Sequence, residues 1–536
     1  LKLFFFAKAK GIFAAKNSSK IAIFLVLCQL NFAIAQTAPN ALPTGGNVVA
    51  GSAIISQSQT ANSAQMNINQ TSQRAVINWD SFNVGKNATV NFNQPNSSAV
   101  TLNRVTGVGQ SMVDGMVRAN GQVVLVNPNG VTVSKGAEIN AAGVVATTMD
   151  IANQDFMDGK STYKGNGKGA VVNEGKISAN DPNGYIALLA PEIRNEGYVL
   201  ARKGVNSAVA LAAGQQITLD FRGDQLISVN VDKATYGALI ENKRVVEVKG
   251  GLIVVAAGSA NQLMGSVIKN TGRISASTAV NNGGVIELVA SNVTQAGTVA
   301  ANGKGAISKG GQVNIVGEDI TLAANSKTTA TGKAGGGNVE VGLGRTQATN
   351  VNQAPVQALA QAAVPVTTST TVDQRQAAVK QVAAVASETK QLAKTVTVAA
   401  NATINTSAIQ NGDAGNIVIW SEVKTTVNGI LKALGGALGG NGGFIETSSK
   451  GSVNFGKQLV VDTSAAKGKS GLWFLDPIDL IIDADAASVI ATALANNNVT
   501  IAVNGNVCPS LGGCTQNGSG SLTIASGANI LKQGNT

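Results

Sequence analysis

The chain has 536 residues, of which 62 are glycine, 4% are aromatic and 13% are charged. Ordinary globular chains carry more charged and aromatic residues, and disordered chains carry fewer Val, Ile and Leu. The formal net charge is +11 at pH 7. The lysines and arginines form no cluster with aromatic residues, which argues against a nucleic-acid partner.

Histidine is absent from the sequence. The chain therefore lacks the usual general base near neutral pH and the commonest metal ligand. It also lacks the usual axial ligand of haem, although a tyrosine could serve instead. This absence argues against an enzyme, and we assign no catalytic, cofactor-binding or metal-binding residue from the sequence.

Residues 1–35 have the three parts of a secretory signal peptide. Lysines are scattered as far as Lys20, an apolar core follows at 21–30, and Ala33-Ile34-Ala35 fits the small-residue cleavage rule. We expect cleavage between Ala35 and Gln36. The uninterrupted apolar run 21–28 is too short to span a bilayer. The first residue is Leu, which leaves an alternative start codon or a truncated chain open.

Behind the leader, residues 36–70 are polar and β-prone, and we expect them to cap the fold that follows. Residues 74–148 then alternate short apolar segments with Asn/Gly turns. They contain the phrases INWDSFNVG, NRVTG, ANGQVVLVNPNG and NAAGVVATT in that order. Alternation with a period of two predicts strands that bury one face.

These phrases closely resemble the N-terminal secretion domain, or haemagglutination activity domain, of two-partner secretion exoproteins of the filamentous haemagglutinin type. The resemblance covers roughly 36–300 well and the rest only by the style of its repeats. It implies export through a partner transporter in the outer membrane, with folding outside the cell. The positions that match the family's phrases are Asn78, Trp79, Asn103 and Arg104, together with the turn Asn127, Pro128, Asn129 and Gly130.

The turn at 127–130 also has a physical role of its own. Asn127 ends an apolar strand, Pro128 presets φ, and Asn129 and Gly130 tolerate positive φ. We therefore expect a required β-turn, to which a direct contact with the transporter is added.

Two loose repeats continue along the chain. Asn-x-Gly-x-apolar-x-Ala recurs at 173–179, 195–201 and 270–276, and Gly-x-apolar-x-apolar recurs at steps of 28 residues from Gly415 to Gly443 to Gly471. Repeats of 20–30 residues with short strands predict an all-β fold, a right-handed parallel β-helix (a solenoid) of roughly 20 coils. Asn at repeated corners could stack as a hydrogen-bonded ladder. A β-sandwich or an up-and-down barrel is the alternative.

Residues 346–398 lack glycine and are rich in Ala, Gln, Val and Thr. Helical spacing of apolar residues predicts one helix at about 373–395 within this insertion, which is either an inert insertion or a contact for a partner. We expect the domains to be the signal peptide 1–35, the secretion domain 36–300 and β-helix coils at 301–345. The insertion 346–398 and further coils at 399–536 follow, and we expect the C-terminus to be truncated.

Several local features favour structural roles. Cys508 and Cys514 predict a local disulfide that closes a loop tip, with two free thiols as the alternative. Four acidic residues at 476–485 follow apolar core segments and an Asp-Pro turn signal. The dispersed tryptophans Trp79, Trp420 and Trp473 are expected to be core anchors more than sugar platforms.

The leading hypothesis is therefore a secreted or surface-exposed adhesin, or haemagglutinin, of a Gram-negative bacterium. It would reach the surface through the periplasm and bind a glycan or protein receptor on host or bacterial cells. The alternatives are the stalk of a contact-dependent inhibition toxin, a haem- or haemopexin-binding exoprotein, and a β-helix carbohydrate-active enzyme. The reading frame beyond Thr536 would discriminate adhesin from toxin stalk, since an adhesin would continue with repeats.

Overall fold

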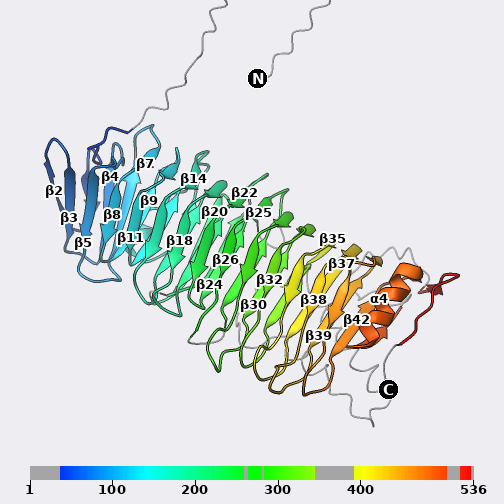
Figure 1. Ribbon diagram of the computed structural model, residues 1–536. Coiled ribbons are helices and arrows are strands. Elements are labelled where there is room, and N and C mark those ends of the chain that lie inside the picture. Colours follow the sequence, from blue (N-terminus) through cyan, green and yellow to red (C-terminus); the bar gives the residue numbers. More distant parts are fainter. Residues whose placement is uncertain are drawn as a thin grey trace, which may run out of the picture. The chain divides into compact units, whose positions relative to one another are not determined.

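The computed structural model describes residues 37–223, 225–258, 263–279, 283–344, 391–503 and 520–532. Residues 37–532 within these ranges form a parallel β-helix, which confirms the predicted fold class (Figure 1). The predicted signal peptide with its cleavage site at Ala35–Gln36, and the predicted Cys508–Cys514 pair, lie outside the described residues. In the described part of the chain, no helix is long and apolar enough to cross a membrane.

The coils stack their strands in three columns, of which the first and second belong to one 26-stranded sheet and the third to a 14-stranded sheet. The first column contains β4 (Arg74–Trp79), β6 (Val100–Val105), β9 (Gln122–Val126), β12 (Gly143–Thr147), β16 (Tyr185–Leu189), β19 (Ala208–Ala212), β24 (Leu252–Ala256), β27 (Val285–Val289), β30 (Gln312–Val316), β33 (Asn338–Val341), β37 (Asn416–Val427), β39 (Phe444–Ser449), β42 (Leu472–Asp476) and β44 (Asn498–Ile501).

The second column is shorter and includes the carboxyl half of β37, which joins the two columns. Its other strands are β7 (Ser111–Val113), β10 (Val131–Val133), β14 (Ala170–Asn173), β17 (Glu192–Asn195), β22 (Leu239–Asn242), β25 (Val267–Asn270), β28 (Asn292–Gln295), β31 (Asp319–Leu322), β35 (Gln391–Val398) and β40 (Ser452–Phe455).

The third column contains β3 (Ala64–Gln70), β5 (Ala88–Asn93), β8 (Met116–Ala119), β11 (Glu138–Ala141), β15 (Lys176–Ala179), β18 (Tyr198–Ala201), β23 (Val245–Val248), β26 (Arg273–Ser275), β29 (Thr298–Ala300), β32 (Lys327–Thr329), β36 (Thr403–Asn405), β38 (Ile430–Lys432) and β41 (Val460–Asp462). Its 14-stranded sheet also includes the antiparallel β2 (Ala53–Gln59). The described residues therefore stack 14 − 1 = 13 parallel strands here. The expected number of coils was too high because loops and insertions lengthen many coils.

The interior is built from the same register position in successive coils. Inward apolar residues stack on their equivalents, as the repeated phrases predict. One such stack in the first column is Val144, Ile186, Val209, Ile253, Ile286, Val313, Val339, Ile417, Ile445 and Trp473, all of them buried. Trp79, Trp420 and Trp473 are likewise buried, as expected of core anchors.

A hydrogen-bonded ladder of amides follows the ends of the second-column strands. Asn173 donates to Asn195 at 2.8 Å, Asn195 to Asn242 at 2.7 Å, Asn242 to Asn270 at 2.7 Å, and Asn270 to Gln295 at 2.5 Å. All five side chains are buried. The predicted ladder is therefore present. Apart from the Asn173 Oδ1 at its first rung, which has no partner among the described residues, it pairs amide groups that would be costly to bury alone.

The cap at the amino-terminal end uses antiparallel strands. β1 (Asn47–Ala50) pairs antiparallel with β4, and β2 pairs antiparallel with β3. Strand β3 already stacks in parallel on β5, so residues 64–70, which we expected in the cap, form the first parallel strand of the third column. The amino-terminal edge is thereby paired and not left open.

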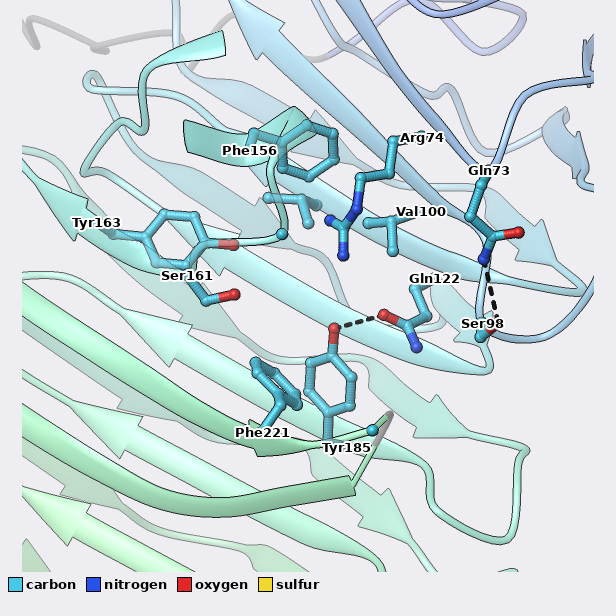
Figure 2. Close-up of a pocket in the computed structure, with 13 residues that line it drawn as sticks. Gln73, Arg74, Ser98, Val100, Gln122, Phe156, Ser161, Tyr163, Tyr185 and Phe221 are labelled. Atoms are coloured by element: carbon cyan, nitrogen blue, oxygen red, sulfur yellow. Dashed lines mark hydrogen bonds between the residues drawn. The ribbon is translucent and has the colours of Figure 1, made fainter. Parts of the chain in front are cut away.

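A small accessory layer covers the outer face of the first column. It consists of α1 (Asn153–Met157) and an antiparallel sheet of β13 (Thr162–Lys164), β20 (Gln216–Arg222) and β21 (Gln225–Lys233). A pocket of about 420 Å³ lies between this layer and the column (Figure 2). These strands carry no repeat signal, because they lie outside the columns.

Near the insertion, β34 (Leu343–Gly344) pairs antiparallel with β35. The predicted helix at about 373–395 lies mostly outside the described residues. Its last positions, from Gln391, belong to strand β35, which returns to the second column. The segment 391–398 is therefore part of the β-helix.

At the carboxyl-terminal end, α4 (Ala484–Leu494) takes the place of a third-column strand after β43 (Leu480–Ile482), which pairs with β45 (Leu522–Ile524). Asp483 caps the helix by accepting from the Ala486 amide at 2.8 Å. The Asn497 side chain then bonds the edge of β41, donating to the Val461 carbonyl at 2.9 Å and accepting from the Thr463 amide at 2.5 Å. One side chain thus replaces the peptide groups of a further strand.

Candidate functional site

The four motif phrases of residues 74–148 end four consecutive strands of the first column. The parallel register places Asn78 of β4 beside Arg104 of β6, then Val126 of β9 and Thr147 of β12. Carboxyl ends of parallel strands meet at one edge of a sheet. Phrases that are separated by 20 to 30 residues in sequence therefore lie side by side.

The turn at 127–130 has a buried base and an exposed tip. The Asn127 side chain is fully buried, donates to the Ser111 hydroxyl at 2.9 Å and accepts from the Asn129 amide at 2.9 Å. Pro128 and Asn129 are exposed. Gly130 has φ of +116°, which L side chains rarely adopt. The geometry agrees with the predicted turn.

A second exposed loop, residues 106–110, is hydrogen bonded to this turn. The Asn129 side chain donates to the Gly107 carbonyl and the Asn127 side chain to the Gly109 carbonyl, both at 3.0 Å. Val108 at the loop tip is 96% exposed. We call residues 106–110 and 127–130 together the motif edge. It is one continuous surface with an apolar tip and exposed amide and carbonyl groups.

Trp79 and Asn103 support the motif edge from inside. The Trp79 indole Nε1 donates to the Asn103 Oδ1 at 3.0 Å, and both side chains are buried. The Thr106 amide donates to the Trp79 carbonyl at 2.8 Å. These two sequence-predicted positions are therefore structural supports, and neither side chain is accessible to a partner protein.

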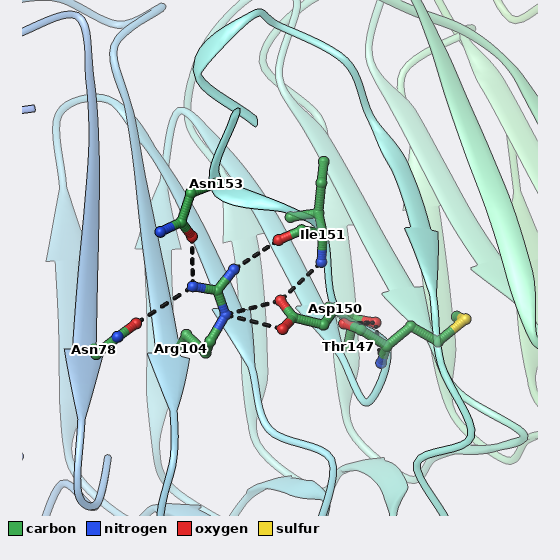
Figure 3. Close-up of polar contacts among 7 residues, drawn as sticks. Asn78, Arg104, Thr147, Asp150, Ile151 and Asn153 are labelled. Carbon is green, nitrogen blue, oxygen red and sulfur yellow. Dashed lines mark hydrogen bonds and ion pairs between the residues drawn. The ribbon is translucent and has the colours of Figure 1, made fainter. Parts of the chain in front are cut away.

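Arg104 is the centre of a polar network with Asn78, Asp150, Ile151 and Asn153, the Arg104 network (Figure 3). Its Nε lies 2.9 Å from the Asp150 carboxylate, its Nη1 lies 2.6 Å from Asn153 Oδ1 and 3.3 Å from Asn78 Oδ1, and its Nη2 lies 2.6 Å from the Ile151 carbonyl. The Arg104 side chain is 14% exposed. The network fastens the segment leading into α1 to strands β4 and β6.

Asp150 and Asn153 were not singled out from the sequence. The available signal was modest, since a lone arginine inside an apolar strand needs a partner when it is buried. Asp150 lies two residues after the end of the phrase NAAGVVATT, but only the register of β6, β9 and β12 reveals that Asp150 and Arg104 meet.

The acidic segment at 476–485 has structural partners. Asp483 caps α4, and Asp479 accepts from the Ser521 amide at 2.8 Å. Within the described ranges, no group of three or more His, Cys, Asp or Glu residues could hold a metal ion. Asp479 and Asp483 therefore each stabilise the fold at the carboxyl-terminal end of the described β-helix.

One carboxyl group stands apart electrostatically. Burial raises the pKa of Glu446 to about 7 from 4.5. The Trp420 indole donates to its Oε1, while its Oε2 makes no hydrogen bond of normal geometry with the described residues. The Ser448 hydroxyl lies close enough to lower the pKa of Glu446, against the larger effect of burial. Glu446 is 1% exposed beside Phe444 and Phe474, so no substrate can reach it in this state.

Comparison with known proteins shows that the motif edge lies within a region matched by a protein-family model. Residues 40–303 match the model of the TPS secretion domain, close to the predicted 36–300. The crystal structure of the HMW1 secretion domain from Haemophilus influenzae has a TM-score of 0.62 and 27% identity, covering 81% of this chain and all of that one.

Two proteins of Haemophilus influenzae, each named "Heme/hemopexin-binding protein", are similar to part of the chain. One is 34% identical over 261 residues, 47% of this chain and 28% of the relative. The other is 32% identical over 252 residues, 43% of this chain and 26% of the relative. The chain thus spans about a quarter of the length of the curated relatives it matches.

Proposed function

This chain belongs to the two-partner secretion exoproteins. From that premise we propose that the motif edge is the surface that its outer-membrane transporter recognises. Proteins with this domain are secreted across the outer membrane of Gram-negative bacteria, which places this chain outside the cell or on its surface. The observation that carries the proposal is the meeting of residues 106–110 and 127–130 in one exposed surface.

The burial pattern assigns different roles to the motif residues. Asn103, Trp79 and Asn127 are buried and build the edge, whereas Val108 and Asn129 are exposed and available for contact. A transporter that binds the edge as the first coils form would contact Val108 and Asn129 first. A variant at these two positions should therefore separate recognition from folding.

The same strands serve as the template for the coils behind them. Each coil buries its apolar residues only when it docks on the previous one. Folding outside the cell then biases the chain against sliding back, and export needs no nucleotide. A chain that lacks residues 36–150 should remain in the periplasm, and normal secretion of this deletion would contradict the proposal.

The recognition step is tested with the double variant Val108→Asp/Asn129→Ala, expressed together with the transporter. We expect the amount in the medium to fall about tenfold. The melting temperature should fall only slightly, because the double variant loses the Asn129 bond to the Gly107 carbonyl at an exposed site. The matched control is Ile307→Asp, another loop residue that is 85% exposed, which should be secreted normally. Equal secretion of the double variant would remove the motif edge from recognition.

Once outside, the chain is proposed to act as a non-enzymatic binding protein. The names of the two Haemophilus relatives favour haem or haemopexin as the first ligand to test, ahead of the adhesin hypothesis that the sequence alone favoured. The match covers only about a quarter of each relative, so adhesion to a cell-surface glycan or protein stays a second candidate.

Binding of the secreted chain to immobilised haemopexin and to haemin tests the first candidate, and agglutination of red cells tests the second. Saturable capture of haemopexin without agglutination would support the first. Agglutination without capture of haemopexin or haemin would support the adhesin. Bovine albumin on the same surface is the control for nonspecific capture.

A further inference from the structure

The pocket between the first column and the accessory layer has a floor of strand residues and a roof of accessory residues (Figure 2). Its volume of about 420 Å³ lies in the range of small-molecule sites. The floor is formed by β4, β6, β9 and β16, and the roof by α1, β13 and β20. Residues as far apart as Gln73 and Gly223 line it, so the pocket exists only in the folded chain.

A glycine shapes the floor. The register runs from Arg74 to Val100, Gln122, Gly143 and Tyr185 on adjacent strands. A Cβ at Gly143 would meet the Tyr185 ring at 2.7 Å, so the missing side chain lets this ring lie across the strand. The Tyr185 hydroxyl then donates to Gln122 Oε1 at 2.9 Å.

This arrangement presents hydrogen-bond donors to the pocket. Because the Gln122 Oε1 is occupied, its Nε2 is the group left to face the pocket, and Gln122 is only 8% exposed. The Tyr163 hydroxyl is directed into the same space, has no hydrogen-bond partner in the described part of the chain, and belongs to a side chain 3% exposed. Burial raises the pKa of Tyr163 above its usual value, so this hydroxyl keeps its proton.

Arg74 adds the positive charge. Its guanidinium lies 5.3 Å from the centre of the Phe156 ring, and it forms no ion pair or hydrogen bond with any described residue. The described residues lining the pocket include no acid. A guanidinium against an aromatic ring retains its donors for a planar anion.

The aromatic side chains that line the pocket favour a ligand that itself contains a ring. Phe156, Tyr163, Tyr185 and Phe221 surround the donors, and Phe221 meets Tyr185 edge to face at 4.9 Å between ring centroids. We propose that this pocket binds a small aromatic carboxylate, whose carboxylate meets Arg74 and the Gln122 amide while its ring packs among the aromatic side chains. This site is separate from the motif edge and goes beyond the proposed export and haemopexin functions.

Isothermal titration of the secreted full-length chain with phenylacetate tests the site, with phenylacetamide as the neutral probe of the same shape. We expect a dissociation constant of about 1 mM or lower for phenylacetate. The amide should bind at least about tenfold more weakly, because it lacks the charge that Arg74 recognises.

Two variants assign the binding to this pocket. Arg74→Gln should weaken phenylacetate by about tenfold or more and Tyr163→Phe by about threefold, while the exposed Arg118→Gln on β8 should leave it unchanged. Melting temperatures of all three variants verify folding. The absence of saturable binding up to about 20 mM, or equal binding by wild type and Arg74→Gln, would overturn the proposal.

Discussion

Two arginines on adjacent strands of the first column lie in opposite environments. Arg104 on β6 contacts Asn78, Asp150, Asn153 and the Ile151 carbonyl. The Arg74 guanidinium on β4 lies over the Phe156 ring and has no hydrogen-bond or ion-pair partner among the described residues. A guanidinium whose donors are all used holds the fold together. A guanidinium whose donors face a pocket is available to a ligand. Whether a buried polar group already has partners therefore distinguishes a structural role from a ligand-binding role.

The same contrast separates two other regions of the β-helix. In the amide ladder every buried side chain from Asn173 to Gln295 bonds its neighbour. In the outer cluster of Trp420, Phe444 and Phe474, Glu446 is buried with one oxygen that makes no hydrogen bond of normal geometry. Stability should therefore depend on the ladder being intact and should gain from neutralising Glu446.

Breaking the ladder should have the largest effect. Asn242→Ala removes the bonds to Asn195, Asn270 and the Arg273 carbonyl and leaves buried groups unpaired. We expect a loss of about 4 kcal/mol in the free energy of unfolding, measured by urea denaturation. Asn206→Ala, at an exposed amide with one long bond of 3.3 Å, is the control, and an equal loss in both would contradict the special role of the ladder.

Neutralising Glu446 should raise the free energy of unfolding, whereas breaking the ladder should lower it. Its raised pKa means that the folded chain binds this proton more tightly than the unfolded chain does. The free energy of unfolding should therefore fall as pH rises from about 4.5 to about 7, by about 3 kcal/mol, and stay level above. Glu446→Gln should remove this dependence and be more stable than wild type at pH 8.

Denaturation of both proteins at pH 4.5, 6 and 8 provides the measurement. The nearby Asp476 also raises this pKa, so Asp476→Asn tests how much of the shift is charge repulsion and how much is burial. A wild-type stability that does not change over this pH range, with no gain from the glutamine, would show that the unpaired oxygen is satisfied in solution.

Removing the charge of Arg104 should cost less, because Asp150 is 47% exposed and water can solvate it. We expect Arg104→Met to lower the free energy of unfolding by about 2 kcal/mol. The loss should be greatest around residues 150–153, which hydrogen exchange would detect as faster exchange in this segment. Unchanged protection there would mean that the accessory layer is held without the network.

The smallest effect on stability should come from the other arginine. Arg74→Met should change the free energy of unfolding by less than about 0.5 kcal/mol, apart from the loss of its ring contact, while weakening phenylacetate binding. A large loss of stability in this variant would remove the contrast between the two arginines. The measurement is the same urea denaturation used for Arg104→Met.

Repetition explains what the sequence could predict. The repeated Gly-x-apolar phrases predicted the columns, and Asn173, Asn195 and Asn270 predicted the ladder, because identical positions stack in every coil. The tip of the turn at 127–130 followed from the φ requirements of its residues. Asn242 was missed because its surrounding phrase, ENKR, lacks the glycine of the repeat.

Features built once along the chain were harder to predict. In the accessory layer, β13 pairs antiparallel with β20, which is more than 50 residues away in the sequence. This pairing occurs once, so no repeat in the sequence predicts it. Asp150 and the pocket residues depend on it. Helix α4 did carry signals, namely the capping Asp483 and apolar residues at helical spacing. The segments before it have the apolar character of strands, so the prediction of further coils at 399–536 included it and was wrong for this segment.

Asn497 has a further consequence for how copies of this protein behave in solution. An open edge of stacked strands is a template on which another chain can add and start a fibre. Because the Asn497 side chain bonds the Val461 carbonyl and the Thr463 amide, these two peptide groups at the edge of β41 are not available to a second molecule. Asn497→Ala would reopen it, and light scattering at high protein concentration should then detect association that the wild-type chain resists.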